Sequence, residues 1–412
     1  MLLERAWHDL WIGLFVILIA IGVFAGQGLV IGLGAMGLLM AGIAWLWSRL
    51  SLDEVTYTRK LSQQRVFIGE EVTLAVTLTN RKPVPLGRVR VEDDLPDSVE
   101  ISDADIGASP SPNTRSLRHH TSMSWYERIS WEYKIRPSER GLFYLGPARL
   151  RSGDLFGFFS SEANSPDRDH LLVYPRVLPL PELGIPALRP MGETRGGIRI
   201  FPDPARPSGI RDYQRGDPLK TVDWKATARM QRLQVRTFEP SSAMTMVLAV
   251  GIETTARYWE GYSPVNLERV ITAAASVATY VFESHHMLGL FSNGTPILSD
   301  RPMSVAPSRA PDQLTAVLEA LATIRPMAQG PMSSKLLEHA RAFRLGTTIV
   351  LVVALIPEEM VETLSSLKRQ GFELAVIYVG DEDCPQLPEG VVVHDIREHF
   401  ARMELAGDFG PT

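Results

Sequence analysis

The sequence predicts a membrane-anchored chain of several domains, in which a transmembrane helical hairpin precedes an all-β domain and an α/β domain. Three observations predict this order: an apolar run from Leu10 to Trp47 without ionisable side chains, period-two alternation within 53–185, and alternating strand and helix patterns over 241–400. The 412 residues fit two to three domains with small attachments. A net charge of −5 and a single cysteine give no sign of a nucleic-acid partner, a disulfide or a cysteine zinc cluster.

The apolar run has the length and layout of a transmembrane hairpin over residues 1–50. Gly26-Gln27-Gly28 divides it into Leu10–Ala25 and Leu29–Trp47, each about long enough to cross a hydrocarbon core. Backbone polar groups in lipid need internal partners, so two helices joined by a turn are favoured over a cleaved signal peptide or a soluble hairpin. Tryptophan, which prefers the membrane interface, occurs at both outer ends, as Trp7, Trp11, Trp45 and Trp47.

Glycines and flanking cations predict the packing and orientation of this hairpin. Small residues let helices approach closely, and the second helix contains Gly28, Gly32, Gly34, Gly37 and Gly42. The turn carries no cation, whereas the outer ends carry Arg5, Arg49, Arg59, Lys60 and Arg65. By the positive-inside rule, both ends and the domains that follow are expected on the cytoplasmic side of the cell membrane.

Residues 53–185 have the pattern of a β-domain. Val72–Thr79 and Ile129–Ile135 alternate apolar and polar side chains, and Pro- and Gly-containing breaks separate strands at short spacing. This spacing predicts an all-β, immunoglobulin-like sandwich. The polar stretch Ser102–Ser124 is expected to be a long mobile loop, with the histidines at 119 and 120 exposed rather than bound to a metal.

Residues 186–240 contain the densest signal, SGIRDYQRGDPLKTVDWKATARMQRLQVRTFEP from Ser208 to Pro240. Asp217 can accept hydrogen bonds from free backbone N–H groups, and Pro218 suits the first helical position. We therefore predict a helix from Pro218 to about Met230, capped by Asp217. A strand is expected after it, because Leu233, Val235 and Thr237 alternate with polar residues.

The same segment is basic within an acidic chain. The stretch from Arg195 to Arg236 contains ten cations, namely Arg195, Arg199, Arg206, Arg211, Arg215, Lys220, Lys225, Arg229, Arg232 and Arg236. Its four acids are Asp203, Asp212, Asp217 and Asp223, which leaves an excess of six positive charges. This excess fits a docking surface for an acidic partner, a phosphate group or anionic lipid, and it fits equally a set of Arg–Asp pairs that stabilise a turn-rich segment.

These residues resemble the hallmark of the bacterial and archaeal family called domain of unknown function 58. That hallmark has a glycine, an Arg-x-Tyr, a Gly-Asp and a Trp-Lys-x-x-Ala-Arg, which are here Gly209, Arg211, Tyr213, Gly216, Asp217, Trp224, Lys225, Ala228 and Arg229. The stretch Arg140–Phe159 is also similar to the family's sequence before the hallmark. The resemblance implies no established activity, but it implies a MoxR-type AAA+ ATPase as partner and a role in assembly or maturation of other proteins.

Strand and helix patterns alternate over 241–400, which predicts a doubly wound α/β sheet. The predicted strands are Thr245–Val250, Met287–Phe291, Thr347–Leu355 and Phe372–Val379, and the predicted helices are Pro264–Glu283, Asp312–Thr323, Ser334–Phe343 and Pro357–Gln370. The family resemblance implies that this region is similar to a von Willebrand factor A domain. Residues 401–412 are expected to form a flexible tail.

A von Willebrand factor A domain usually binds a divalent cation through an Asp-x-Ser-x-Ser motif after its first strand, because hard cations need clustered oxygen ligands. The aligned positions here are Gly251, Glu253 and Thr255, so the first carboxylate is missing. The stretch after the central strand, Ala354–Pro357, supplies no second acid. We therefore predict a degenerate metal site and no cofactor.

Two hypotheses for the function follow. The favoured one is a non-enzymatic membrane-anchored adaptor that binds its partner through Arg211, Tyr213, Arg215, Gly216, Asp217, Trp224, Lys225 and Arg229. The alternative is an enzyme at the membrane surface in which Asp212, Asp217 or Asp223 is the acid or base for an anionic substrate. Cys384 is not expected to be catalytic, because the preceding acids at 381–383 would raise the pKa of its thiol.

Overall fold

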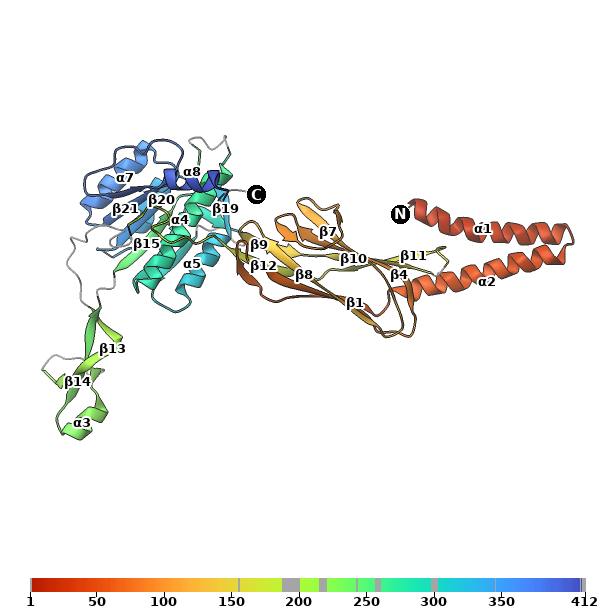
Figure 1. Ribbon diagram of the computed structural model, residues 1–412, viewed down its shortest axis with the longest axis horizontal. Coiled ribbons are helices and arrows are strands. Elements are labelled where there is room, and N and C mark those ends of the chain that lie inside the picture. Colours follow the sequence, from red (N-terminus) through yellow and green to blue (C-terminus); the bar gives the residue numbers. More distant parts are fainter. Residues whose placement is uncertain are drawn as a thin grey trace. The chain divides into compact units, whose positions relative to one another are not determined.

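A computed structural model of the chain (Figure 1) describes residues 2–154, 156–186, 201–214, 221–241, 244–255, 261–297, 303–344, 346–407 and 409. Side chains are described for all of these residues except 2–11, 201–208 and 237–241. The chain divides into two compact units, Met1–Tyr174 and Pro175–Thr412. The predicted order of an apolar N-terminal helix, a large β-rich region and an α/β region is confirmed.

Two helices begin unit 1, α1 (Leu2–Phe24) and α2 (Gly28–Ser51), and they lie antiparallel on either side of a short turn (Figure 1). Within the part of the chain that the structure describes, one helix, α2, is long and apolar enough to cross a membrane by length and composition. Gly34 and Gly37 are buried against Ile19 and Phe15 of α1, as the prediction of close packing requires. Gly28, Gly32 and Gly42 face open space, so the prediction is wrong for these three glycines.

Twelve strands follow in unit 1: β1 (Val55–Leu61), β2 (Arg65–Phe67), β3 (Val72–Asn80), β4 (Leu86–Pro96), β5 (Val99–Ile101), β6 (Ile106–Ala108), β7 (Thr114–Met123), β8 (Arg128–Pro137), β9 (Gly141–Leu145), β10 (Ala148–Gly153), β11 (Ser160–Ser165) and β12 (Asp169–Tyr174). They form sheets of order β1-β3-β8-β5, β11-β10-β4-β7-β6 and β2-β12-β9. Alternate side chains of β3 are buried, as expected for a strand with one face on a core.

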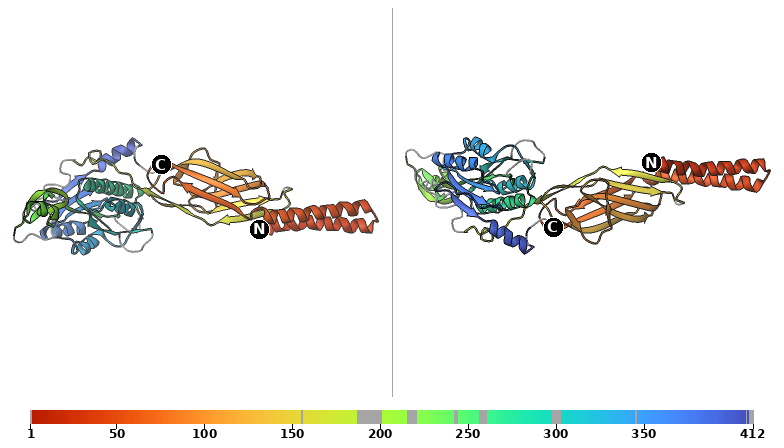
Figure 2. Two further views of the ribbon diagram at one scale, coloured as in Figure 1. Left: turned by 90° about the horizontal axis from the view of Figure 1, so that it is seen from below. Right: turned by 90° about the horizontal axis from the view of Figure 1, so that it is seen from above.

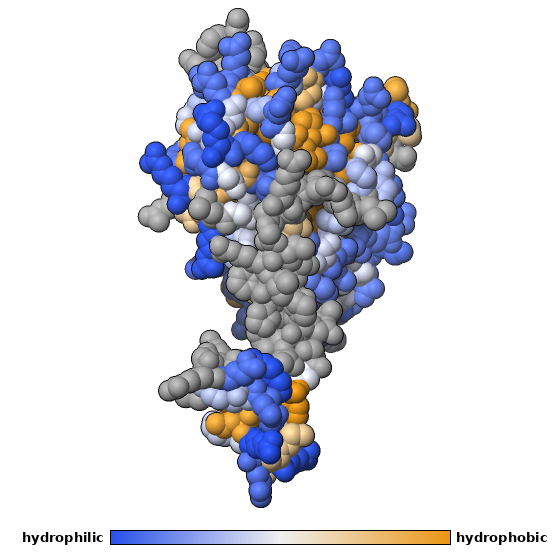
Figure 3. Space-filling view, turned by 90° about the vertical axis from the view of Figure 1, so that its left-hand side faces the viewer, coloured by the Kyte–Doolittle hydropathy of each residue, from blue (hydrophilic) through white to orange (hydrophobic). Residues whose placement is uncertain are grey.

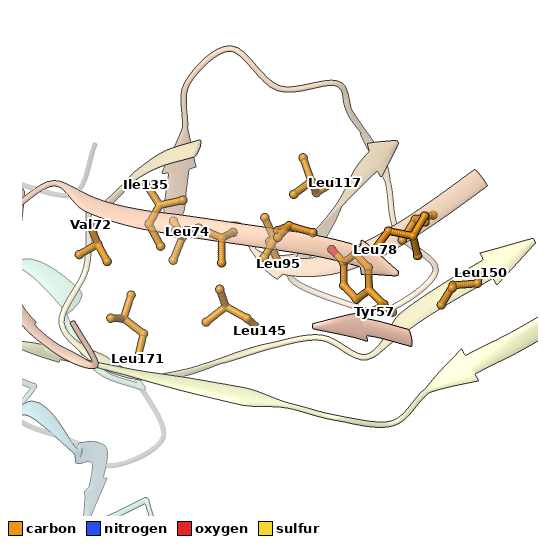
Figure 4. Packing of buried hydrophobic residues seen from close by; sticks show 14 of the residues in the cluster. Tyr57, Val72, Leu74, Leu78, Leu95, Leu117, Ile135, Leu145, Leu150 and Leu171 are labelled. Carbon is orange, nitrogen blue, oxygen red and sulfur yellow. The ribbon is translucent and has the colours of Figure 1, made fainter. Parts of the chain in front are cut away.

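A single core joins the sheets of unit 1. Leu74 and Leu78 of the first sheet pack in one cluster with Leu117 and Leu150 of the second and Leu171 of the third (Figure 4). All five are nearly or completely inaccessible to solvent. Each sheet therefore contributes buried apolar side chains to one shared core.

The prediction of a mobile loop over Ser102–Ser124 is wrong. This stretch contains β6 and β7, and β7 pairs antiparallel with β4 along most of its length. Ser116 is buried because its hydroxyl donates to Asp94, at 2.9 Å. His119 is also buried: a hydrogen bond of 2.9 Å joins its Nε2 to the Tyr133 hydroxyl, and burial lowers the pKa of its imidazole to about 4.

Arg59 connects all three sheets of unit 1 through hydrogen bonds inside the core. Its guanidinium contacts the Asp93 carboxylate of β4 at 3.2 Å and the Asp169 carboxylate of β12 at 3.3 Å, and it donates to the Asp167 carbonyl. The Tyr57 hydroxyl donates to Asp93 at 2.8 Å. Burial raises the pKa of the Asp93 carboxyl to about 6, and the positive charge of Arg59 opposes this shift.

Replacing Arg59 should test this network. Arg59→Met leaves Asp93 buried without a cation, which costs about 3–5 kcal/mol of unfolding free energy. The pKa of folded Asp93 then rises further above its unfolded value, so the loss should be larger at pH 7.5 than at pH 5. Denaturant unfolding of the detergent-solubilised protein at both pH values measures this loss of unfolding free energy. Lys134→Met, which removes an exposed cation 3.4 Å from Glu71, is the control and should change little; equal losses at both pH values would contradict the argument.

Unit 2 begins with a segment that precedes the arm and packs on the α/β domain. The Leu178 amide donates to the Ser276 hydroxyl at 2.9 Å, and Leu183 and Ile185 are fully buried. The predicted domain boundary at 185 therefore lies eleven residues too late, since unit 1 ends at Tyr174. The contact with Ser276 explains the shift, because it joins this segment to a helix of unit 2.

The α/β domain is a six-stranded sheet of order β18-β16-β15-β20-β21-β22, with β15 (Thr245–Val250), β16 (Met287–Ser292), β18 (Ser304–Ser308), β20 (Thr348–Val353), β21 (Glu373–Tyr378) and β22 (Val392–Asp395). All neighbours are parallel except the edge strand β18. Its helices are α4 (Pro264–Glu283), α5 (Gln313–Ala322), α6 (Met332–Ala340), α7 (Glu358–Arg369) and α8 (Arg397–Leu405), and β17 (Gly294–Pro296) pairs with β19 (Ile324–Ala328). Figure 2 shows helices on both faces of the sheet.

The sequence predictions for this domain are confirmed within a few residues at each end. Strand β15 and helix α4 have the predicted bounds, and the Ser263 hydroxyl caps α4 by accepting from Asn266. The expected flexible tail is wrong for its first five residues, which belong to α8. Arg269 of α4 holds this helix through an ion pair of 2.6 Å with Glu404, and it forms a second ion pair, of 2.7 Å, with Asp381 after β21.

Candidate functional site

The hallmark segment forms an antiparallel ribbon with a short helix, which we call the arm. Strand β13 (Phe201–Asp212) pairs with β14 (Gln234–Ser241), and α3 (Trp224–Met230) lies between them in sequence and contacts β14. Among the described residues of the arm, Val222, Gln234 and Val235 are buried. An isolated two-stranded ribbon has little stability of its own.

The helix in the arm begins later than predicted. Residues 215–220, which include Arg215, Gly216 and Asp217, lie outside the described residues. Val222 forms a β-bridge with Val235, and the Asp223 amide donates to the Gln234 carbonyl at 2.8 Å. This stretch therefore pairs with β14 instead of continuing a helix from Pro218, and α3 starts at Trp224.

Asp223 organises the start of α3. One carboxylate oxygen accepts from the amides of Lys225 and Ala226, each at 3.0 Å, and the other accepts from the Arg236 guanidinium at 2.9 Å. The amide of Ala226 and the guanidinium of Arg236 hold the pKa of the Asp223 carboxyl below its usual range. Asp223 thus links the first turn of α3 to β14 by a capping bond and an ion pair.

Asp212 is also used in the structure of the arm. It lies opposite Gln234 in the β13–β14 register, and its carboxylate accepts from the Gln234 side-chain amide. The predicted Arg–Asp pairing is therefore confirmed for Asp223, while Asp212 has an amide partner. Because both described acids form bonds that build the arm, no described feature favours the acid–base hypothesis.

The outer surface of the arm combines exposed apolar and cationic side chains. Trp224 is 67% exposed, and Ile210, Met230 and Leu233 are also exposed. Figure 3 shows hydrophobic atoms next to hydrophilic ones on the arm, at the bottom of the view. The described side chains between 209 and 236 include five cations, Arg211, Lys225, Arg229, Arg232 and Arg236, against two acids, Asp212 and Asp223. Large apolar side chains left exposed together mark contact sites for other molecules.

Of the predicted partner-binding residues, Arg211, Tyr213, Trp224, Lys225 and Arg229 lie on the described arm, and all except the half-buried Tyr213 are exposed. The Arg211 guanidinium donates to the Asp212 carbonyl at 3.1 Å. The site prediction missed Ile210, Met230 and Leu233. Exposure of these three could not be read from the sequence, because apolar residues in predicted helices and strands are normally assigned to a core.

The positions aligned with a metal motif lie in the loop after β15, but their side chains do not converge. A side-chain carbon at Gly251 would lie 2.8 Å from Val353, so a carboxylate does not fit there. The Glu253 carboxylate accepts from the Met332 amide at the start of α6, at 3.2 Å. The Thr255 hydroxyl instead donates to the Gly261 carbonyl at 2.8 Å. The described residues contain no group of three or more His, Cys, Asp or Glu side chains that could hold a metal ion.

The side-chain amide of Asn293 joins two further segments at this edge of the sheet. Asn293 accepts from the Ile252 amide and donates to the Gly330 carbonyl, both at 3.1 Å. Burial raises the pKa of the Glu253 carboxyl, and hydrogen bonds from Met332 and Asn293 oppose this shift. Glu253 therefore joins the loop after β15 to the start of α6, which is a structural role.

The side chain of Cys384 is partly buried. Burial raises the pKa of its thiol, and the negative charge of Asp395 raises this pKa further.

The fold and the site define a class: an α/β domain with a helix-bearing basic arm before its first strand. Residues 209–399, which include most of the arm and the six-stranded sheet, match the family model described as "Protein of unknown function DUF58". This part of the chain is a domain of that family, and the resemblance drawn from the hallmark is confirmed.

An uncharacterised relative and several solved structures are similar to the chain. The protein YeaD of Bacillus subtilis is 24% identical over 265 residues, which is 62% of this chain and 59% of that protein. The chain thus spans about 59% of the length of this relative. A CARDB domain from Pyrococcus furiosus (12% identity, TM-score 0.20) and a non-cellulosomal cohesin from Archaeoglobus fulgidus (12% identity, TM-score 0.21) each match 29% of this chain and 91% of their own. TM-scores this low do not establish a shared fold.

Substitution of Asp223 should loosen the start of α3. Asp223→Ala removes both capping bonds and the contact with Arg236, so the amides of Lys225 and Ala226 should exchange with solvent faster. Hydrogen-exchange mass spectrometry of the arm measures this change. Asp223→Asn keeps an oxygen acceptor and should exchange nearly as the native chain does. Equal exchange in the alanine and asparagine variants would contradict the capping role.

A magnesium titration should test the loop after β15. Calorimetry of the native protein and of Glu253→Ala is expected to show the same small heats of dilution, because Glu253 is bound to the start of α6 and no carboxylate fits at Gly251. Glu253→Ala should also lower the thermal midpoint, since the first amide of α6 loses its acceptor. Tight Mg²⁺ binding that disappears in Glu253→Ala would show that our interpretation of this loop is wrong.

Proposed function

We propose that this protein is a membrane-anchored adaptor whose arm binds an acidic surface of a protein partner. The observation that carries the proposal is the surface of the arm, where Trp224, Met230 and Leu233 are exposed among cations that outnumber acids five to two. Apolar anchors surrounded by charge are typical of interfaces that are transient and orientation-specific. The family resemblance indicates the partner: a MoxR-type AAA+ ATPase acting in assembly or maturation of other proteins.

The remaining parts of the chain would position the arm. We propose that α1 and α2 both cross the cell membrane as a hairpin, with the cations at its outer ends placing the soluble domains in the cytoplasm. Support comes from the apolar composition of α2 and from the close packing of Gly34 and Gly37 on α1. The same proposal assigns the β-rich region as an immunoglobulin-like sandwich, supported by the core shared between its sheets.

The finer identity of the α/β domain is also part of this proposal. Its strand order, with parallel central strands and one antiparallel edge strand, supports a von Willebrand factor A-like domain. Such a domain without a complete metal motif would present surfaces rather than a metal-dependent contact. Hydrogen bonds of Glu253 and Asn293, which hold the loop after β15, support that assignment.

Charge reversal on the arm should test the proposal. Arg211→Glu with Arg229→Glu should weaken capture of the purified MoxR-type ATPase of the same genome at least ~10-fold, which corresponds to about 1.4 kcal/mol. The full-length protein in detergent serves as bait, and the loss should be greatest at low salt.

The matched control changes the same charge elsewhere in unit 2. Arg341→Glu with Arg344→Glu alters exposed cations near the end of α6 and should leave capture unchanged. Circular dichroism checks that both double variants fold. Unchanged capture by the arm variant, or an equal loss in the control, would mean that the arm is not the docking surface.

A further inference from the structure

An aromatic turn of unit 1 lies against the apolar helices. The turn joins β10 to β11, and Phe159 in it is buried in one cluster with Ala41 and Ala44 of α2. Phe158 and, from α1, Phe15 pack against the same cluster. Figures 1 and 2 show the β10–β11 ribbon extending to α2.

The position of this contact along α2 gives its depth in a bilayer. Ala41 precedes Trp45 by four residues, which is a helix rise of about 6 Å. Tryptophan prefers the membrane–water interface, so Trp45 marks that level when α2 crosses a membrane. The aromatic turn therefore reaches about one helical turn deeper than the interface, a depth comparable to that of helices that lie in the interface.

Among the described residues of the turn, Phe156 has a large apolar side chain that is exposed. It is 55% exposed, and its ring stacks on Phe158 with centroids 6.0 Å apart. The neighbouring helix α2 also exposes apolar side chains, including Leu39 and Ile43. Phe156 thus extends the apolar surface that α2 already exposes. Such a surface is unfavourable in water and favourable in hydrocarbon.

The backbone of the turn is suited to an environment with little water. The Asp154 carboxylate accepts from the Phe156 amide at 2.8 Å and from the Phe159 amide at 2.6 Å. The Asp154 amide in turn donates to the Phe159 carbonyl at 3.2 Å. Backbone groups that enter lipid must find partners inside the protein, and these bonds satisfy four such groups of the turn, namely three amides and one carbonyl.

A second turn places aromatic residues beside the end of α2. Trp125 and Tyr126, in the turn between β7 and β8, are both about two-thirds exposed. The Tyr126 amide donates to the Lys82 carbonyl at 3.2 Å, and the Lys82 ammonium donates to the carbonyl of Ser51, the last residue of α2. Both turns therefore lie at the end of unit 1 from which α2 emerges.

We propose that this end of unit 1 is a lipid-binding surface, in which the β10–β11 turn enters the bilayer beside α2 and Trp125 and Tyr126 lie among the headgroups. The inference rests on the proposed membrane anchoring, because the depth is measured along α2. Its occupant is the bilayer, since the exposed aromatic side chains continue the apolar surface of the anchor. Membrane contacts made by these two turns, in addition to the two helices, would fix the tilt of unit 1 on the membrane. The two helices alone leave this tilt free to vary.

Site-directed spin labelling tests the proposal on the full-length protein. Cys384→Ser gives a cysteine-free background, to which Phe156→Cys, Leu39→Cys or Tyr144→Cys is added separately. The labelled proteins are reconstituted in vesicles of phosphatidylethanolamine and phosphatidylglycerol. Collision of the nitroxide with oxygen, which concentrates in lipid, is compared with collision with a water-soluble nickel complex. Leu39 reports the anchor, and the exposed Tyr144 of β9 reports the aqueous part of unit 1.

The expected result is a high oxygen-to-nickel ratio at 39, a low one at 144 and an intermediate to high one at 156. A label at 156 as accessible to nickel as the label at 144, with 39 in lipid, would overturn the inference and leave the anchor intact. A label at 156 shielded from both reagents would overturn it in favour of contact with another protein or a second copy. Nickel access at 39 would overturn both the anchor and this inference. Circular dichroism of each variant checks folding.

Discussion

The junction between α2 and the β-rich domain is the constraint on which the rest of unit 1 depends. A helix ends with carbonyl groups that have no partner within the helix, and these need a donor where the chain leaves an apolar environment. Lys82 provides it: its buried ammonium donates to the carbonyls of Ser51 and Asp53. Burial lowers the pKa of this ammonium, while Asp53 and Glu54 oppose the shift. Through this one side chain, the turn after β3 is bound to the end of α2. This turn therefore lies at the edge of the domain from which α2 extends.

Where a strand or helix mainly buries one apolar face, its sequence was sufficient to predict the element. Alternation along β3 and the apolar face of α4 each depend on one core, and the structure has both with the predicted bounds or nearly so. Strand β7 was missed because its buried positions include Ser116 and His119. These polar groups are buried at little cost because Asp94 and Tyr133 bond them, and both partners lie on other strands.

The arm shows a different reason for error. Asp217 and Asp223 are both able to cap a helix, and the local sequence favours the first because Pro218 follows it. Residue 217 lies outside the described residues, and the described helix α3 is capped by Asp223, whose neighbour Val222 pairs with Val235, thirteen residues further on. Strand β13 was not predicted, since Pro202, Pro204 and Pro207 argue against a strand. Prolines are tolerated here because a two-stranded ribbon has only edge strands, which need not donate from every residue.

The exposed side chains of the arm have a consequence for how tightly a partner can be held. Among the described side chains of the ribbon, Val222, Gln234 and Val235 are buried, whereas Trp224 and Met230 of the short helix are exposed, so a partner that covers these two would also restrict the ribbon. Part of the free energy of such an association would go into restricting the ribbon, so the complex would dissociate faster than its contact area suggests. Rapid dissociation of this kind would let one arm bind many partner molecules in succession.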